Sequence, residues 1–386
     1  MVNTALSQLI RISNVVGKDS ALVQGVGGNT SVKTDDGRWM YIKASGTALK
    51  DMNGRRGWCR VNREAVESIF TDRALAGMDV SSRELEMVKR LQAACDDGTT
   101  AKARPSVECP LHVLLDTCVI HLHALVTLAY ASAREGKARL FDLFSDASTP
   151  PLWVPYADPG YSLGQKAYRL VARYERECGC KPTVMFLEKH GLLVAADSPD
   201  KALRRVRQVV KRCSDGLSHT SAHTVLRVRT SDAERVQDAL SQALAAVCGE
   251  ASPVHHFVDK TVSAVLARDD VAQLVKAPPL TPDEMGFVSS PVLYLETTDP
   301  QAMGEKVAAC VARRGKPPVA FLVRGYGLFI AGEPTMAGIV RDIVVGSLFV
   351  RSHAQDMGGI NGLNKRQRGF IDNWEAEKFR VQLAVS

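Results

Sequence analysis

The chain has 386 residues, of which 45% are hydrophobic and 24% are charged, a composition that excludes a fibrous or intrinsically disordered protein. A chain of this length exceeds what one hydrophobic core usually serves, so two domains are expected. The formal net charge of +7 is small and the basic residues are scattered, which favours an anionic small-molecule substrate over nucleic acid as the partner.

Nine cysteines occur at irregular spacings, and Cys178 and Cys180 form the one close pair. This pair lacks the C-x-x-C spacing of a redox motif or of a structural zinc site. The sequence shows no signal peptide and no apolar run long enough to cross a bilayer. We therefore expect free thiols, a reducing cytoplasmic location and no membrane partner.

A helix is predicted over residues 3–18, and a glycine-rich loop follows at residues 25–31. The glycines allow positive φ angles and bring backbone N–H groups close to an anion, while Asn29 and Ser31 can add side-chain hydrogen bonds. A simple tight turn explains the same residues, and on composition alone it is the favoured interpretation.

A β-hairpin is predicted next, with strands at residues 31–33 and 39–43, because Thr34-Asp-Asp-Gly37 has the chemistry of a hairpin turn. A second loop of small residues, Ala44–Thr47, follows the hairpin. The two loops that flank the hairpin can jointly surround a phosphate or a carboxylate.

The segment Ser81-Ser-Arg-Glu84 has the capping-box pattern and predicts a helix over residues 81–91. The loop after it presents Ser106, Glu108 and His112. A carboxylate near a divalent cation acts as a ligand or transfers protons. Glu108 is equally compatible with an acid favoured by a helix N-terminus, and for His112 a structural role is the preferred interpretation.

Alternate side chains of a strand share a face, so the H-x-H spacing of His121 and His123 aims both imidazoles at one point. A catalytic zinc site needs a third protein ligand, and His190 is the candidate because it sits at a turn between two apolar runs. By itself H-x-H also describes two polar residues at a strand end. His219 and His223 have helical i, i+4 spacing without a further ligand, so we expect them on the surface.

A helix is predicted at residues 124–135 and a basic helix at 200–213. Between them, the proline-rich loop Trp153–Gly160 presents Tyr156. A tyrosine on a rigid loop can donate a proton or serve as an interface aromatic, and both interpretations stay open.

Six segments, in this order, resemble the class II aldolase/adducin family, which includes the fuculose-phosphate and rhamnulose-phosphate aldolases. They are Gly-Gly-Asn-Thr-Ser-Val-Lys at 27–33, Lys-Ala-Ser-Gly-Thr at 43–47, Pro-Ser-Val-Glu at 105–108, His-Leu-His at 121–123, Val-Pro-Tyr at 154–156 and Lys-His-Gly-Leu-Leu-Val at 189–194. Several motifs in the correct order over residues 1–225 are far more specific than any one of them.

The resemblance implies an α/β/α sandwich on a mainly antiparallel sheet, assembled as a homo-oligomer with active sites between subunits. A tetramer is implied by the family, although a duplicated chain can satisfy the same interfaces as a dimer. The implied zinc ligands are His121, His123 and His190, and Glu108 matches the catalytic carboxylate. Tyr156 matches a tyrosine acid supplied across the subunit boundary.

The resemblance also implies a set of residues that bind the substrate phosphate: Gly28, Asn29, Ser45, Gly46 and Ser106. Val107 departs from the pattern, because the fuculose enzymes have a second serine there. A valine offers no hydroxyl, so the resemblance supports zinc binding more strongly than phosphate binding.

The implied activity is reversible aldol cleavage of a ketose phosphate, or a related polyhydroxy ketone, to an aldehyde and a dihydroxyacetone-phosphate-like donor. Zinc stabilises the enediolate, Glu108 moves its proton, and Tyr156 assists the aldehyde oxygen. Two alternatives remain: a dehydratase, decarboxylase or epimerase that uses the same enediolate, and a non-catalytic adducin-like binding module. Imidazole ligands also suit other divalent metals.

Residues 226–386 lie outside the simple aldolases. They begin with an amphipathic segment at 232–247, and Phe321–Ala331 resembles Phe186–Ala195, with Tyr326 where the third histidine stands. We interpret this part as a second α/β domain that is a degenerate duplicate without its metal.

An amphipathic helix over residues 370–380 is predicted to dock on the body of the protein. A C-terminal domain that ends in such a segment resembles the aldolase halves of larger aldolase/dehydrogenase proteins. No G-x-G-x-x-G loop follows a predicted strand, so no nicotinamide cofactor is expected.

Overall fold

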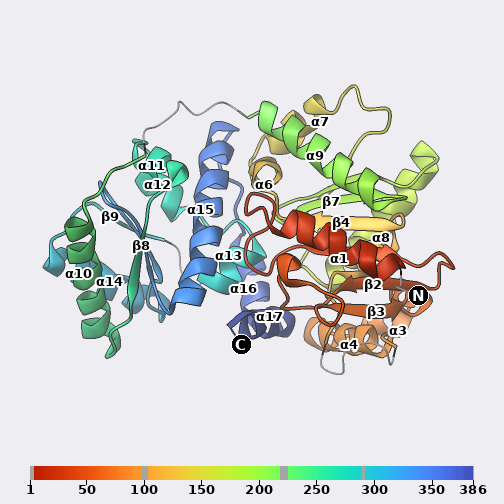
Figure 1. Cartoon of the computed structure of the whole chain (residues 1–386), viewed down its shortest axis with the longest axis horizontal. Helices are drawn as coiled ribbons and strands as arrows, with labels where there is room; N and C mark the ends of the chain where they lie inside the picture. The colour runs from red at the N-terminus through yellow and green to blue at the C-terminus, as the bar shows by residue number, and fades with distance from the viewer. Residues whose placement is uncertain (1–3, 97–102, 218–224, 289–291, 386) are drawn as a thin grey trace.

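The computed structural model describes residues 4–96, 103–217, 225–288 and 292–385. These residues form two β-sheets with helices around them (Figure 1). The strands of the first sheet are β1 (Asn29–Lys33), β2 (Trp39–Lys43), β3 (Trp58–Asn62), β4 (Cys118–Leu122), β5 (Leu152–Val154), β6 (Val184–Leu187) and β7 (Gly191–Ala196). The strands of the second sheet are β8 (Val254–Phe257), β9 (Leu293–Leu295), β10 (Ala320–Val323) and β11 (Gly327–Ala331).

The first sheet has the order β3-β2-β1-β4-β7-β6-β5, and its neighbours are antiparallel except for β5 with β6. The central strands β4 and β7 are buried along their whole length, because helices cover both faces of the sheet. Side chains alternate between the two cores, so Ile120 packs into one and Val119 into the other. His121 lies on the face of Val119 by the same alternation.

One face of this sheet is covered by α1 (Thr4–Gly17), α6 (Leu125–Ala131), α7 (Gly136–Leu143) and α9 (Pro199–Asp215). The other face is covered by α2 (Arg63–Glu67), α3 (Arg73–Gly77), α4 (Val80–Ala93), α5 (Cys109–Val113) and α8 (Tyr161–Cys178). Two short 3₁₀ helices are η1 (Leu49–Asp51) and η2 (Ser68–Phe70). The α/β fold class with a helix–sheet–helix sandwich on a mainly antiparallel sheet is thus confirmed.

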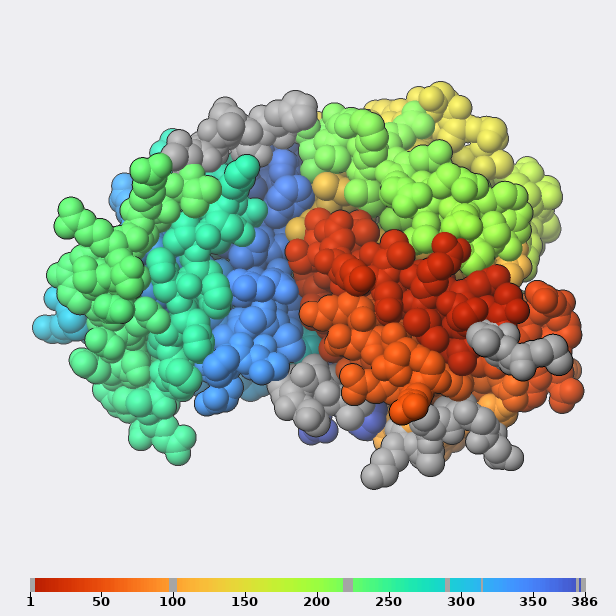
Figure 2. All heavy atoms as spheres, in the orientation of Figure 1, coloured from red at the N-terminus to blue at the C-terminus, as the bar shows by residue number. Residues whose placement is uncertain are grey.

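The C-terminal half forms a second α/β region, as expected. Its helices are α10 (Thr230–Cys248), α11 (Lys260–Leu266), α12 (Val271–Lys276), α13 (Pro282–Val288), α14 (Pro300–Arg314), α15 (Pro334–Asp356), α16 (Lys365–Asn373) and α17 (Glu375–Val385). Helix α15 lies between the two sheets (Figure 1), and its residues abut the N-terminal segments on the molecular surface (Figure 2). Leu128, Leu280 and Val350 form a small shared core between the halves.

The second sheet repeats the connectivity of part of the first. Its strand order is β8-β11-β10-β9, which matches β4-β7-β6-β5. In both sheets the first two pairs are antiparallel and the last pair is parallel. The duplication itself stays a prediction, as does the domain boundary at residues 225/226, but equal topology is what a duplication produces.

Two glycines mark equivalent points of the two sheets. Gly191 begins β7, where an added Cβ would lie 2.5 Å from the carbonyl oxygen of Leu122. Gly327 begins β11, where an added Cβ would lie 2.9 Å from the carbonyl oxygen of Phe257. In each case the neighbouring strand passes too close for a side chain, and the glycine precedes the same pair of the register, Leu192–Leu122 in the first sheet and Leu328–Phe257 in the second.

This register shows what the second sheet carries in place of the three histidines. His256 stands at the position of His121. Val258 follows β8 where the second histidine follows β4, and Tyr326 precedes β11 where the third precedes β7. The His256 imidazole hydrogen-bonds the carbonyl oxygen of Tyr326 at 2.7 Å, and one such imidazole cannot form a metal site.

Several predicted elements are confirmed and three are corrected. The capping box is wrong: Asp79 caps α4 by accepting from the Ser82 amide, and Glu84 turns inward. The helix expected at 124–135 ends at Ala131. The single terminal helix is interrupted at Trp374, whose extended ψ of 116° separates α16 from α17.

All nine cysteines are free thiols. No helix in the described ranges has the length and apolar character required to cross a membrane. His219 and His223 lie outside the described residues.

Candidate metal centre

The three histidines named from the sequence converge on one point. His121 lies on β4, His123 follows that strand directly, and His190 occupies the turn between β6 and β7. Their candidate ligand nitrogens all lie within 4.8 Å of one another, and all three residues are buried. Nε2 of His121 and Nε2 of His123 are 3.2 Å apart. The described residues hold one group of this kind.

The local backbone explains why the third imidazole reaches the other two. Lys189 has a left-handed φ of 58°, which folds the chain sharply between β6 and β7. Gly191 then lets β7 run close to β4, since an added Cβ would lie 3.0 Å from Cε1 of His121. The turn thus brings His190 over the end of β4.

Glu108 stands beside the histidines. Its Oε1 lies 2.8 Å from Nε2 of His190 and its Oε2 lies 3.4 Å from Nε2 of His121. Asn29 donates its side-chain amide to the same Oε2 at 2.6 Å. The residue is the N-cap of α5, yet its side chain makes no capping hydrogen bond. The carboxylate is therefore directed to the histidines instead of to the helix amides.

Burial and neighbouring groups set the protonation of these side chains. Burial holds the pKa of His121 well below its ordinary value, so this imidazole is neutral and keeps a lone pair available. Burial alone would raise the pKa of Glu108, but the neighbouring imidazoles lower it by more, and the pKa lies well below its usual range. A neutral imidazole beside an ionised carboxylate is a donor set for a divalent cation.

A chain of buried hydrogen bonds ends at Glu108. Burial lowers the pKa of His112 to about 3, so this imidazole is neutral. It donates through Nε2 to Oδ1 of Asn29, whose amide nitrogen binds Glu108, and its Nδ1 accepts from the Ser31 hydroxyl at 2.8 Å. His112 therefore connects to the site through Asn29, which extends the structural role expected for it.

The histidines also make contacts on the side away from the centre. Nδ1 of His121 faces the carbonyl oxygen of Leu192 at 3.2 Å. Nδ1 of His123 contacts Oδ2 of Asp283, which belongs to α13 in the C-terminal half. Sequence reasoning missed Asp283, because an acid in the first turn of a helix is ordinary and 160 residues separate it from its partner.

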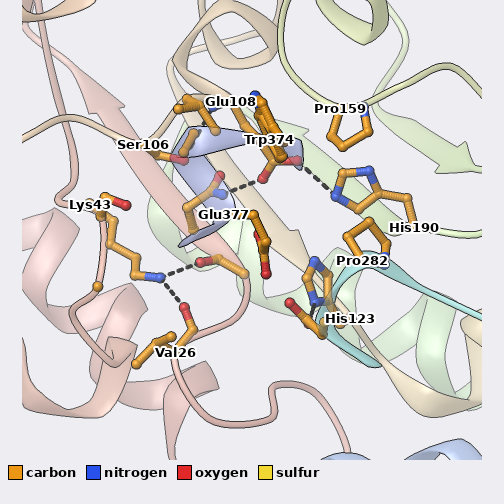
Figure 3. A pocket seen from close by; sticks show the side chains of 17 residues that line it. Val26, Lys43, Ser106, Glu108, His123, Pro159, His190, Pro282, Trp374 and Glu377 are labelled. Carbon is orange, nitrogen blue, oxygen red and sulfur yellow. Dashed lines mark hydrogen bonds and ion pairs between the residues drawn. The ribbon is translucent and has the colours of Figure 1, made fainter. Parts of the chain in front are cut away.

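A cavity of about 50 Å³ opens beside the histidines (Figure 3). Its lining includes every residue of the expected phosphate-binding set, namely Gly28, Asn29, Ser45, Gly46 and Ser106. The lining also includes four residues that were not named as site residues from the sequence, namely Lys43, Asp283, Trp374 and Glu377. The two loops that flank the β1–β2 hairpin therefore do meet at one cavity, and the C-terminal half closes it.

Lys43 and Glu377 bring opposite charges to this cavity. The Lys43 ammonium donates to the carbonyl oxygens of Val26 at 2.6 Å and Gly28 at 2.7 Å, so it braces the glycine-rich loop. Glu377 lies on α17 and is buried, and Figure 3 shows it between Lys43 and His123. Lys43 was part of a recognised motif, whereas no local signal in the sequence connects Glu377 to the site.

Tyr156 does not line the cavity of its own chain. Its hydroxyl donates to Asp158 at 3.3 Å, and burial raises the pKa of the phenol above its ordinary value. A role across a subunit boundary stays a prediction for this residue.

The residues fit a divalent cation. Oε1 of Glu108 is buried, and the group that faces it is Nε2 of His190, at 2.8 Å. When that imidazole is neutral with its proton on Nδ1, both atoms carry lone pairs, and a cation between them relieves the repulsion. Three imidazoles and a carboxylate are ligands that zinc and related metals accept.

The chain is similar to known proteins. The model of the class II aldolase and adducin N-terminal domain matches residues 7–215. The "uncharacterized oxidoreductase YuxG" of Bacillus subtilis is 22% identical over 98% of this chain, and the chain spans 58% of the length of that relative.

Similar solved structures cover only part of the chain. The N-terminal class II aldolase domain of a conserved protein from Thermoplasma acidophilum is 25% identical, with a TM-score of 0.44, over 56% of this chain and 94% of that one. The L-fuculose-1-phosphate aldolase of Thermus thermophilus is 16% identical, with a TM-score of 0.32, over 54% of this chain and 93% of that one.

Proposed function

Because the chain belongs to the class II aldolase and adducin family, we propose that it is a metal-dependent lyase. It cleaves a ketose phosphate, or a related polyhydroxy ketone, into an aldehyde and a three-carbon donor such as dihydroxyacetone phosphate. The observation that carries the proposal is the position of Glu108, which lies between the imidazoles of His121 and His190 and the amide of Asn29. A carboxylate held in this way is suited to proton transfer.

The three histidines would hold the cation, for which zinc is the proposed identity. When bound, a divalent cation supplies a Lewis acid that stabilises negative charge developing on the substrate oxygens. The lowered pKa of His121 supports this, because the imidazole needs no deprotonation before it binds a metal. Burial of the cluster excludes water that would otherwise compete for the cation.

The protons of the reaction can be assigned to named side chains. In the cleavage direction, the hydroxyl group on the carbon that becomes the aldehyde loses its proton. The carbon–carbon bond breaks, its electron pair passes to the donor fragment, and that fragment takes up a proton at carbon. Glu108 starts as a carboxylate, takes up one proton for the one that the hydroxyl group releases, and delivers it to the donor carbon, so that the protons balance. Asn29 fixes the orientation of the carboxylate. Tyr156 of a neighbouring subunit assists the aldehyde oxygen in a homo-oligomer of two or four chains.

Two loops would hold the anionic end of the substrate. They offer backbone N–H groups and the hydroxyls of Ser45 and Ser106, and the Lys43 ammonium adds positive charge behind them. Val107 supplies no hydroxyl, and Glu377 adds a carboxylate to the same cavity. These two residues weigh toward a polyhydroxy ketone without a phosphate, so substrates of both kinds belong in the test.

The test is to incubate the zinc-loaded protein with ketose 1-phosphates and with the corresponding free ketoses, and to measure aldehyde release. We expect release by the wild-type protein and a 10²- to 10⁴-fold slower rate for Glu108→Gln, the range for loss of a general base. The Glu108→Gln variant should keep its metal, since three histidines remain. Loss of water or carbon dioxide, or epimerisation without an aldehyde, would instead assign a different reaction to the same site.

A further inference from the structure

The second half of the chain has no metal cluster of its own among the residues described, but it reaches into the centre of the first half. Helix α13 carries Asp283 in its first turn, and Oδ2 of this carboxylate contacts Nδ1 of His123. Both side chains are 7% exposed. A carboxylate–imidazole contact at this depth, between residues 160 positions apart, joins the two halves at the metal-binding cluster.

The two nitrogens of His123 face in different directions. Nε2 lies 3.2 Å from Nε2 of His121, on the side of the cluster, and Nδ1 faces Asp283. An acceptor carboxylate favours the tautomer with its proton on Nδ1, which leaves the Nε2 lone pair free for a metal. Leu192 does the same for His121 through a neutral carbonyl oxygen. Asp283 differs in bringing a negative charge to the imidazole that it orients.

The contact between Asp283 and His123 is enclosed by the glycine-rich loop. An added Cβ at Gly27 would lie 3.0 Å from Oδ2 of Asp283 and 3.0 Å from Nδ1 of His123. Any side chain at residue 27 would therefore press on both partners at once. The absence of a side chain there allows the loop to close over the pair.

Helix α13 is also fixed from the other side. Glu284, the next residue, pairs with Arg351 of α15 at 2.7 Å, and it accepts from the Leu280 amide at 2.8 Å. Arg351 is 3% exposed and donates to one carbonyl group of α12, that of Leu274, and to those of Ala277 and Pro278 between α12 and α13. The start of α13 is thus clamped, so Asp283 meets His123 from a rigid element, as a precise metal site requires.

We propose that Asp283 is a positioning residue for the metal ligand His123, and that the C-terminal half thereby completes the metal centre of the N-terminal half. The assignment rests on the proposed metal centre and is independent of which substrate is cleaved. Loss of a carboxylate that orients a metal-binding histidine typically weakens metal affinity about 10- to 100-fold.

The test measures zinc affinity of the full chain by competition with a chromophoric chelator, for the wild type, Asp283→Asn and Asp283→Ala. We expect affinity to fall about 10- to 100-fold, more for Ala than for Asn, because asparagine still accepts a hydrogen bond. The matched control is Asp270→Asn, which removes an ion-paired carboxylate at the start of α12, in the same half of the chain and outside the lining of the cavity. Cobalt-loaded protein should show an altered visible spectrum for the Asp283 variants alone.

The outcomes separate this assignment from the proposed function. No metal binding by the wild type would overturn both. Wild-type affinity in both Asp283 variants, or an equal loss in Asp270→Asn, would overturn the positioning role alone. Should the variants fail to fold, ¹⁵N-histidine NMR of zinc-loaded wild type decides: a proton on Nδ1 of His123 supports the assignment, and zinc on Nδ1 overturns it.

Discussion

Asn29 donates its side-chain amide to Oε2 of Glu108 over 2.6 Å, and this hydrogen bond links the glycine-rich loop to the carboxylate of the site. The amide can do so only in one orientation, because its oxygen accepts from the neutral imidazole of His112. Ser31 donates to the far nitrogen of that imidazole. The orientation of the carboxylate thus depends on two further buried side chains that do not line the cavity.

Replacing His112 with Phe should lower both stability and activity. The change leaves the buried Asn29 oxygen without a donor, which costs about 1–3 kcal/mol of unfolding free energy, and it frees the amide to rotate away from Glu108. We expect kcat to fall by more than KM changes. Ser31→Ala, at the far end of the same chain, should have the weaker effect on kcat; an equal or larger effect would contradict the orientation argument. Steady-state kinetics of the two variants check the effects on kcat, and urea unfolding checks the loss of stability.

Replacing His190 with Ala should abolish stoichiometric zinc binding, because one of the three proposed imidazole ligands is lost and Glu108 is assigned to proton transfer instead of to holding the metal. The matched control is His256→Ala, which removes the imidazole at the position in the second sheet equivalent to His121. Elemental analysis after dialysis should find about one zinc per chain in the wild type and in the His256 variant. Loss of zinc from the His256 variant would show that the second sheet takes part in metal binding.

Local patterns predicted most of the fold. The β1–β2 hairpin follows from the turn at Thr34–Gly37, and the apolar runs of β4 and β7 follow from burial on both faces. The helix at α4 was predicted, but its capping box was wrong, because Asp79 accepts the capping hydrogen bond and Glu84 accepts instead from the buried amide of Tyr161. That amide lies 77 residues away, beyond the reach of a local pattern.

The residues of the site also divide into those that local sequence patterns reveal and those that they do not. The three histidines and Glu108 could be named because each belongs to a short motif whose chemistry is visible in the sequence. Asp283 and Glu377 could not be named, because their roles arise only when the C-terminal half folds against the first. The interruption at Trp374 was missed for the same reason, since nothing near residues 370–380 breaks the amphipathic pattern.

Glu84 should make stability depend on pH. Burial raises its pKa from the ordinary 4.5 to about 7 in the folded protein, so the folded state holds a proton that the unfolded state releases. The contribution of Glu84 to the free energy of unfolding is therefore greatest below pH 4.5. It falls as pH rises to about 7, by at most about 1.4 kcal/mol per pH unit. Glu84→Gln should remove this fall, so urea unfolding of the two proteins should diverge between pH 5 and 7. If the unfolding free energies of the two proteins changed in parallel over this pH range, the raised pKa of Glu84 would be refuted.

Glu377 should discriminate against phosphorylated substrates. Its carboxylate lines the cavity that Ser45 and Ser106 also line, and two like charges in a buried site repel each other strongly because little water screens them. Removing the charge in Glu377→Gln therefore favours a phosphate dianion and leaves a neutral ketone almost unaffected. We expect KM for a ketose 1-phosphate to fall about tenfold, which corresponds to about 1.4 kcal/mol, with little change for the free ketose.

The control for Glu377 lies two residues earlier on the same helix. Glu375 is half-exposed and pairs with Arg104 at 3.5 Å, so Glu375→Gln removes the same charge from α17 outside the cavity. A general loosening of α17 would change KM for both substrates in both variants, whereas local repulsion changes one substrate in one variant. If Glu377→Gln instead weakened binding of the phosphorylated substrate, the carboxylate would be holding Lys43 and its loop in place, and its role would be structural.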